Sequence, residues 1–179
     1  MKRLLEQAKH EYSERQRLLA LAVEGIFFIF LLPWLLMKFS GTLDGLFNLP
    51  RGVTGWLQIA LGVALTAAGC FFALWSIYAQ FTRGRGTPVP IMATQKLIIT
   101  PPYSYCRNPM ALGTFGMYLG VAIIIGSWSA AGLVLLGAVA LSAYIKLVEE
   151  KEMEARFGSE YEAYRRSTPF LFPRLKNRR

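Results

Sequence analysis

Two short polar stretches of this chain carry side chains that could bind a charged or polar ligand. The first ends in Arg107-Asn108-Pro109, and the second begins with Glu149-Glu150. A guanidinium and a carboxylate can each hold an oppositely charged group, and an asparagine amide both donates and accepts hydrogen bonds. Each stretch adjoins a long apolar segment. The pattern therefore indicates a polar site at the edge of an apolar body.

The apolar body is predicted to be a bundle of membrane helices. Hydrophobic residues make up 54% of the 179 residues and charged residues only 17%. A run of twenty apolar residues covers about 30 Å as a helix, which is one hydrocarbon thickness. We expect an all-α, polytopic membrane protein that forms a single domain over residues 1–179, with four transmembrane helices at Leu18–Met37, Gly55–Phe81, Met110–Gly126 and Trp128–Val148.

The distribution of basic residues predicts the orientation. Of the 20 lysines and arginines, five precede Leu18, four lie in the loop after the second span and nine lie from Lys146 onward. The first connector holds the remaining two, so eighteen fall on one side. The positive-inside rule then places both termini and the proline-rich loop in the cytoplasm, at the plasma membrane of a prokaryote or the endoplasmic reticulum of a eukaryote. The net charge is +9, but the basic residues flank the apolar blocks and form no stripe on one face, so no nucleic-acid partner is expected.

The short Gly126-Ser127-Trp128-Ser129 turn predicts that the third and fourth spans form an antiparallel hairpin. The domain thus divides into residues 1–81, with an N-terminal helix and two spans, and residues 82–179, with a loop, the hairpin and a cytoplasmic helical tail. In a hairpin, the start of one helix lies beside the end of the next. The two polar stretches should therefore meet in one cytoplasmic pocket.

Each feature also has a simpler interpretation. Pro109 could merely start a helix, and Arg107 could anchor to lipid phosphates. Glu149 and Glu150 point about 100° apart on a helix, so they cannot face one ligand atom equally. Intramembrane Glu24 is a candidate for a helix–helix hydrogen bond. With only two cysteines and one histidine in the chain, no metal site is expected.

The two stretches resemble the motifs of the membrane methyltransferases that include isoprenylcysteine carboxyl methyltransferases and phospholipid N-methyltransferases. Those enzymes carry a motif like GPYxxxRHPxYxG and, about forty residues later, EExxLxxxFGxxYxxYxxxVPxxxP. This chain reads PYSYCRNPMALG from Pro102 to Gly113. It then has matching residues at Glu149, Glu150, Met153, Phe157, Gly158, Tyr161, Tyr164, Pro169 and Pro173.

The resemblance implies an S-adenosylmethionine site that is open to the cytoplasm, with membrane lipids as neighbours and a lipidic or small hydrophobic methyl acceptor that enters from the bilayer. Its implied catalytic residues are Arg107 and Glu150, with Glu150 as the base if the acceptor is an amine. The cofactor-binding residues that it implies are Gln95, Lys96, Leu97, Ile98, Tyr103, Asn108, Pro109, Gly113, Glu149 and Glu150.

Four positions depart from the family pattern. Asn108 stands in place of histidine, Ala111 in place of tyrosine and Pro102 in place of glycine. Ile145 occupies the position at which the prenylcysteine enzymes carry a basic residue that faces the substrate carboxylate. A prenylcysteine is therefore not the expected acceptor, while an amine, a thiol or another nucleophile stays open. Two other functions are considered: a non-catalytic membrane scaffold, and an NADPH-dependent enzyme similar to the sterol reductases.

Overall fold

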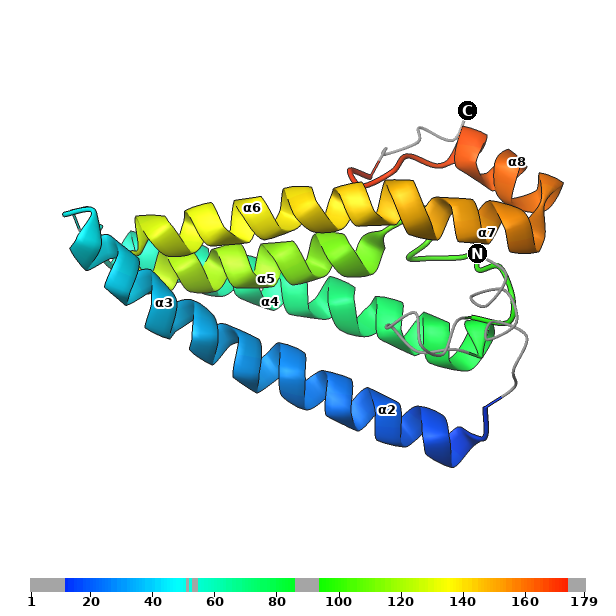
Figure 1. The fold of residues 1–179 in the computed structure, drawn as a ribbon, viewed down its shortest axis with the longest axis horizontal. Coiled ribbons are helices and arrows are strands. Elements are labelled where there is room, and N and C mark those ends of the chain that lie inside the picture. The colour runs from blue at the N-terminus through cyan, green and yellow to red at the C-terminus, as the bar shows by residue number, and fades with distance from the viewer. Residues whose placement is uncertain (1–11, 51, 53–54, 86–93, 174–179) are drawn as a thin grey trace.

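The computed structural model describes residues 12–50, 52, 55–85 and 94–173, and every regular element in these residues is a helix (Figure 1). The all-α prediction is therefore confirmed for this part of the chain. The α-helices are α2 (Glu14–Ile26), α3 (Leu32–Leu46), α4 (Trp56–Ala79), α5 (Pro109–Ile125), α6 (Trp128–Tyr144), α7 (Glu150–Phe157) and α8 (Ser159–Ser167). Three single π-helical turns continue them, at Phe27–Leu31 (η1), Gln80–Gly84 (η2) and Ile145–Glu149 (η4).

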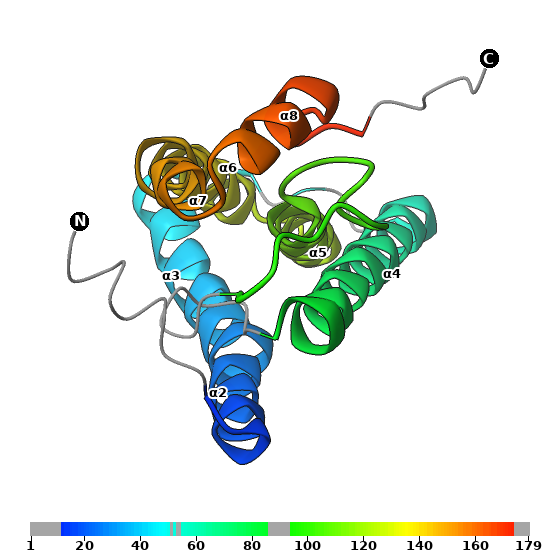
Figure 2. The same cartoon turned by 90° about the vertical axis from the view of Figure 1, so that its right-hand side faces the viewer.

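Among the described residues, three continuous helices are long and apolar enough to cross a membrane. They are Glu14–Leu46, Trp56–Gly84 and Trp128–Phe157. Helix α5 is also apolar, but its 17 residues extend only about 26 Å. Figure 2 shows α5 at the centre of the bundle, between α4 and α6. The count of four spans and their orientation stay predictions.

The first helix is longer than the sequence pattern predicted. It was expected to span Leu18–Met37 and to be followed by a turn-rich connector, yet it continues to Leu46. The error comes from the small and polar residues after Met37, which favour turns in isolation. In the fold, α3 packs against α6, and the Ser127 hydroxyl donates to Asp44 Oδ2 at 2.5 Å. Tertiary contacts therefore hold this stretch helical.

Within a π-helical turn of the first helix, the Phe28 carbonyl is left free to accept a hydrogen bond from α5. The Leu32 amide donates to the Phe27 carbonyl, five residues earlier. Pro33 stands five residues after Phe28 and has no amide hydrogen, so it cannot donate to the Phe28 carbonyl in the same way. The Tyr118 hydroxyl on α5 donates to that carbonyl at 2.6 Å. This bond fixes Phe28 beside the middle of α5.

Glycines bring α4 and α5 into backbone contact. A Cβ atom built at Gly113 on α5 would lie 2.5 Å from the Ala73 amide nitrogen and 2.7 Å from the Gly69 carbonyl oxygen on α4. One at Gly62 on α4 would lie 2.9 Å from the Gly120 carbonyl oxygen. No side chain fits in these spaces. The small residues therefore set the close approach of the two helices, as is common between membrane helices.

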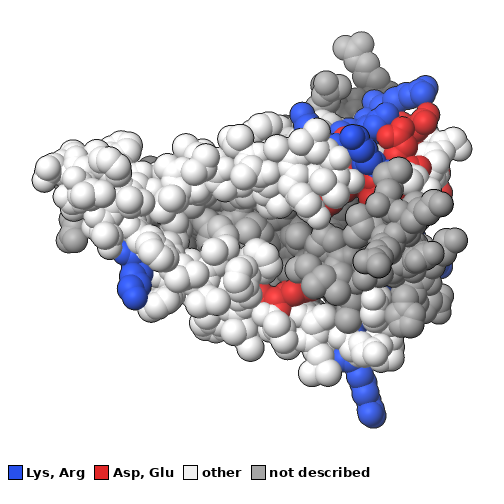
Figure 3. Space-filling model, in the orientation of Figure 1, with Lys and Arg blue, Asp and Glu red and all other residues white. Residues whose placement is uncertain are grey.

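The hairpin prediction is confirmed. Helix α5 ends at Gly126, which adopts a φ of 65°, and α6 begins after Ser127, whose side chain accepts a hydrogen bond from the Ala130 amide. The start of α5 consequently lies beside the end of α6, at the end of the bundle that also carries α7 and α8 (Figure 1). On the face shown in Figure 3, basic and acidic side chains gather mainly at that end.

Candidate functional site

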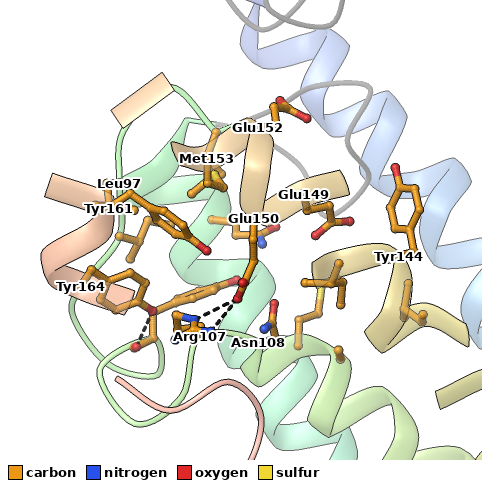
Figure 4. A pocket seen from close by; sticks show the side chains of 18 of the residues that line it. Leu97, Arg107, Asn108, Tyr144, Glu149, Glu150, Glu152, Met153, Tyr161 and Tyr164 are labelled. Atoms are coloured by element: carbon orange, nitrogen blue, oxygen red, sulfur yellow. Dashed lines mark hydrogen bonds and ion pairs between the residues drawn. The ribbon is translucent and has the colours of Figure 1, made fainter. Parts of the chain in front are cut away.

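A cavity of about 390 Å³ opens at the charged end of the bundle. Its walls come from η1, η2, the loop before α5, the first turns of α5, and the continuous helix α6–η4–α7 together with α8. Both polar stretches singled out in the sequence contribute to it, with Arg107 and Asn108 on one side and Glu149 and Glu150 on the other (Figure 4). The fold therefore brings the two motifs to one site.

Arg107 ties the loop before α5 to the C-terminal helices. Its Nη2 atom forms an ion pair with Glu150 Oε1 at 2.6 Å, and Nε donates to the same oxygen at 3.2 Å. Nη1 donates to the carbonyl oxygens of Arg165 and Thr168, both at 2.8 Å. The Arg107 amide also donates to the Pro169 carbonyl at 2.8 Å. Most hydrogen-bonding capacity of this guanidinium is thus used within the protein.

Asn108 continues this attachment. Its amide Nδ2 donates to the Phe170 carbonyl at 3.0 Å, and the Lys146 ammonium lies 4.8 Å from the centre of the Phe170 ring. We call residues 167–172 the C-terminal strap. Arg107 and Asn108 together hold the strap across the start of α5. Asparagine at the histidine position of the motif therefore keeps a hydrogen-bonding role and still lines the cavity.

Tyr103 and Gln80 bring polar atoms to the cavity that the protein does not satisfy. Within the described part of the chain, the buried Tyr103 hydroxyl and Gln80 Oε1 have no well-formed hydrogen bond, although burial raises the pKa of the Tyr103 hydroxyl and the Gln80 side chain lies close enough to offset part of that rise. Both residues line the cavity. A buried polar atom without a partner costs free energy. A ligand that offers complementary groups would remove that cost, so these two atoms are candidate ligand contacts.

Glu149 presents a carboxylate that no described ion pair engages. The ion pairs among the described residues use four other glutamates, which are Glu150, Glu152, Glu154 and Glu162. Glu149 is half-buried, and Figure 4 shows its carboxylate in the cavity on the side of Tyr144. A carboxylate in this position can accept hydrogen bonds from an ammonium or from hydroxyl groups.

The remaining predicted site residues separate into two groups. Leu97 and Ile98 line the cavity, where they supply apolar surface. Gln95 and Lys96 lie outside the lining, and their amides donate to the Gly84 carbonyl at 2.7 and 3.4 Å. Pro109 and Gly113 also lie outside the lining. Pro109 starts α5 and is buried, and Gly113 packs on α4.

Sequence reasoning missed several residues that line the cavity. Met153 and Arg156 lie one and two helical turns after Glu149, on the same face of the helix. That spacing of four and seven residues was the signal that could have revealed them. Gln80 carried no such signal, because its position depends on how η2 packs against the loop. Arg156 is bound by Glu152 and by the Thr94 carbonyl, so it forms part of the polar rim.

Three buried tyrosines near the cavity predict a loss of stability in alkali. Burial raises the pKa of Tyr161 to about 12 and also raises the pKa values of Tyr103 and Tyr164. The Tyr164 hydroxyl donates to the Tyr103 carbonyl at 2.7 Å. In the unfolded chain these phenols titrate near pH 10. Their contribution to stability is therefore complete below about pH 10 and is lost as the pH rises toward the folded-state pKa values.

We expect the free energy of unfolding of the detergent-solubilised protein to fall from about pH 10 toward pH 12. Denaturant titrations at several pH values would measure it. Tyr161→Phe should make the decline shallower, and Tyr78→Phe, whose side chain is 63% exposed and lies outside the cavity lining, should leave it unchanged. An unfolding free energy that stays constant across this range would contradict the buried tyrosine cluster.

Comparisons with known proteins extend the motif resemblance. The chain is 30% identical over 130 residues to methanethiol S-methyltransferase 2 of Bradyrhizobium diazoefficiens, covering 69% of this chain and 46% of that protein. It is 28% identical over 121 residues to methanethiol S-methyltransferase of Crocosphaera subtropica, covering 66% and 43%. It is 31% identical over 126 residues to the nickel-cobalt-cadmium resistance protein NccN of Alcaligenes xylosoxydans xylosoxydans, covering 67% and 53%.

The chain thus spans about half the length of the curated relatives that it matches. No solved structure matches it. The sequence model of the phospholipid methyltransferase family matches residues 57–160, which is more than half of the chain. This range includes nearly all of α4, the loop, the hairpin and α7, so it contains the first motif, the start of the second motif from Glu149 to Gly158, and most of the cavity wall. The chain belongs to the phospholipid methyltransferase family of membrane proteins, in agreement with the resemblance of its two motifs.

Proposed function

We propose that this protein is an S-adenosylmethionine-dependent methyltransferase that acts on a lipidic or small hydrophobic acceptor at the cytoplasmic face of the membrane. The observation that carries the proposal is the cavity at the charged end of the bundle. It joins polar side chains from both family motifs to an apolar wall formed by the helices of the predicted spans. A methyl donor with polar groups and an apolar acceptor could meet there.

The side chains of the cavity fit the chemistry of S-adenosylmethionine. Its amino-acid head carries an ammonium and its ribose carries hydroxyl groups, and the unpaired Glu149 carboxylate could accept hydrogen bonds from either. The unsatisfied Tyr103 hydroxyl and Gln80 oxygen offer a further donor and acceptor. Leu97, Ile98 and other apolar side chains of the lining would hold the adenine ring. Tyr103 keeps its proton, since burial raises the pKa of its hydroxyl.

When bound, S-adenosylmethionine would supply a methyl group made electrophilic by a sulfonium. The chain would then act chiefly by positioning the reactants and excluding water. Arg107 contributes by holding the loop, α7 and the C-terminal strap together around the cavity. Because Glu150 is paired with Arg107, its role in this proposal is to help position the loop before α5. Any proton released by the acceptor would leave toward Glu149 and the solvent at the polar rim.

The names of two relatives help to select the kind of methyl acceptor. Both are named methanethiol S-methyltransferases, which favours a thiol among the acceptors left open by the sequence. Ile145 is buried in the cavity wall, and the neighbouring Lys146 ammonium lies over the Phe170 ring. The cation that a prenylcysteine carboxylate would require is therefore not supplied by these two positions. This arrangement supports a neutral acceptor.

The first experiment is calorimetric titration of the detergent-purified protein with S-adenosylhomocysteine, the demethylated product. We expect micromolar binding, and we expect Glu149→Gln to weaken it by about tenfold or more, because hydrogen bonds to a charged group contribute about 1.5–3 kcal/mol. Glu160→Gln, on the exposed side of α8, is the matched control and should bind normally.

Two outcomes would contradict the proposal. A folded sample that binds neither S-adenosylhomocysteine nor NADPH would favour the non-catalytic scaffold. A sample that binds NADPH alone would favour the reductase-like enzyme. Equal affinity of the wild type and Glu149→Gln would remove only the proposed role of Glu149, since the binding itself would still support the cofactor.

A further inference from the structure

The cavity has an apolar half that faces the predicted membrane interior. Three helical segments build it. Phe28 comes from η1, where the Tyr118 hydroxyl binds its carbonyl. The side chains of this half are Phe28 from η1, Ala111 and Thr114 from α5, and Leu141, Tyr144 and Ile145 from α6 and η4.

We propose that this apolar half is the acceptor site, that it takes an uncharged apolar thiol, and that Ala111 limits the length of acceptor that fits. The inference rests on the proposed methyltransferase function. It goes further by restricting the thiol to an uncharged, apolar one and by naming the residue that selects within this class.

The charges around the cavity argue against an anionic acceptor. Arg107 is paired with Glu150, and Arg156 is paired with Glu152 and bonded to the Thr94 carbonyl. Among the described residues that line the cavity, these are the basic ones, and both are already engaged. The described residues that line the apolar half include no basic side chain, so a phosphate or carboxylate on an acceptor held there would be buried without a cation, which is costly.

Nucleophile chemistry then selects the thiol. An aliphatic amine is protonated at neutral pH, so even beside the Glu149 carboxylate it would have to lose a proton before it could react. An alcohol is uncharged but a weak nucleophile, and a carboxylate such as Glu149 is a far weaker base than the alkoxide that would have to form. A thiol is mostly neutral at pH 7, titrates near pH 8.5 and is intrinsically a strong nucleophile. It can enter uncharged and react with little assistance from the protein.

The reaction balances without another reactant. The thiol sulfur forms a bond to the methyl carbon, and the bond between that carbon and the donor's sulfonium sulfur breaks. Its electron pair stays with the donor sulfur, which becomes a neutral thioether. The acceptor also becomes a thioether, and its proton passes to Glu149 or to water at the rim. The methyl donor of the proposed function is the co-reactant.

The position of Ala111 makes it the residue that limits size. It is only 5% exposed, lies in the first turn of α5 and lines the cavity. The family motif has a tyrosine at this position, so the small side chain leaves space in this chain. The whole cavity, at about 390 Å³, lies near the lower end of the range of about 300–1000 Å³ for ligand sites. A donor of nucleoside size leaves room for a compact acceptor only.

The test measures transfer of radiolabelled methyl groups from S-adenosylmethionine, with the purified full-length protein. The acceptors are alkanethiols of increasing chain length, butylamine, and vesicles of phosphatidylethanolamine. We expect methylation of the short thiols and at least tenfold less of the other two. Methylation of phosphatidylethanolamine or butylamine in preference to every thiol would overturn the assignment.

Two substitutions test the role of Ala111. Ala111→Val, a modest increase in volume, should shorten the longest accepted thiol and lower turnover of that thiol by about tenfold, while affinity for S-adenosylhomocysteine stays unchanged. Ala140→Val, on the exposed face of α6, is the control and should keep the wild-type profile. An identical chain-length profile in Ala111→Val would overturn the size role. Absence of S-adenosylhomocysteine binding in the wild type would instead overturn the proposed function.

Discussion

Arg107→Ala is expected to abolish S-adenosylhomocysteine binding and to lower the stability of the charged end of the bundle, whereas Arg166→Ala should change neither. The two arginines form ion pairs of very different exposure. The Arg107 and Glu150 side chains are 11% and 13% exposed, against 81% and 42% for Arg166 and Glu162. This contrast makes Arg166 a control that removes the same side chain from the same part of the protein.

The size of the effect follows from what remains after the substitution. Without Arg107, the Glu150 carboxylate is left partly buried and unpaired, and the carbonyl groups of Arg165 and Thr168 each lose a donor. Breaking a buried ion pair by removing one partner costs about 3–5 kcal/mol. An exposed pair such as Arg166–Glu162 contributes about 0–1 kcal/mol. Thermal unfolding in detergent, together with calorimetric titration, would measure both consequences.

Arg107→Lys distinguishes two roles of this residue. Lysine keeps the charge but cannot bind Glu150 and two carbonyl oxygens through a planar fork. If Arg107 positions the strap, the lysine variant should lose stability and ligand binding together. If Arg107 is instead a catalytic residue, as the resemblance first implied, the variant should stay as stable as the wild type, bind S-adenosylhomocysteine normally and lose turnover alone. That second result would contradict the positioning role.

The arrangement of the bundle could largely be predicted from the sequence because it depends on strong, repeated signals. Long apolar runs predict helices, and the four-residue turn around Gly126 leaves an antiparallel hairpin as the compatible arrangement. The meeting of the two polar stretches then follows from connectivity. No side-chain partner had to be known for this inference. Glycine commonly ends a helix, and Gly158 does so after α7 with a φ of 54°.

Partners of individual side chains could not be predicted, because they depend on packing between segments distant in sequence. Arg107 was expected to act on a ligand, yet its guanidinium binds carbonyl groups about sixty residues away. The length of the first helix was also wrong. Asp44 looked like a turn residue, but it binds Ser127 across the bundle and so belongs to a helix–helix contact. Local propensity does not contain such information.

Gly113 shows how a motif residue can have a structural role. The resemblance placed it among the cofactor-binding residues, and that role stays a prediction. The structure gives it a second explanation, because a Cβ atom there would lie 2.5 Å from the Ala73 nitrogen and 2.7 Å from the Gly69 oxygen. Both atoms belong to the backbone of α4, so they cannot move aside as a flexible side chain can. The contact between α4 and α5 would have to open.

We therefore expect Gly113→Ala to destabilise the protein by about 1–3 kcal/mol or more, the cost of overpacking a tight contact. Gly132→Ala on α6 is the matched control, because a Cβ atom there meets nothing within 4 Å. Alanine is favoured over glycine in a helix by about 1 kcal/mol, so the control should be neutral or slightly stabilised. Thermal unfolding in detergent would measure both variants.

The same pair of variants separates packing from ligand binding. If Gly113 acts through the α4–α5 contact, S-adenosylhomocysteine affinity at low temperature should fall only as far as the folded fraction falls. A Gly113→Ala protein with wild-type stability but no detectable binding would contradict the packing role and support direct contact with the cofactor. Because α5 carries both Ala111 and the first turn beside Arg107, a shift of this helix on α4 would move both halves of the cavity. The glycine contact thus supports the site from outside its lining.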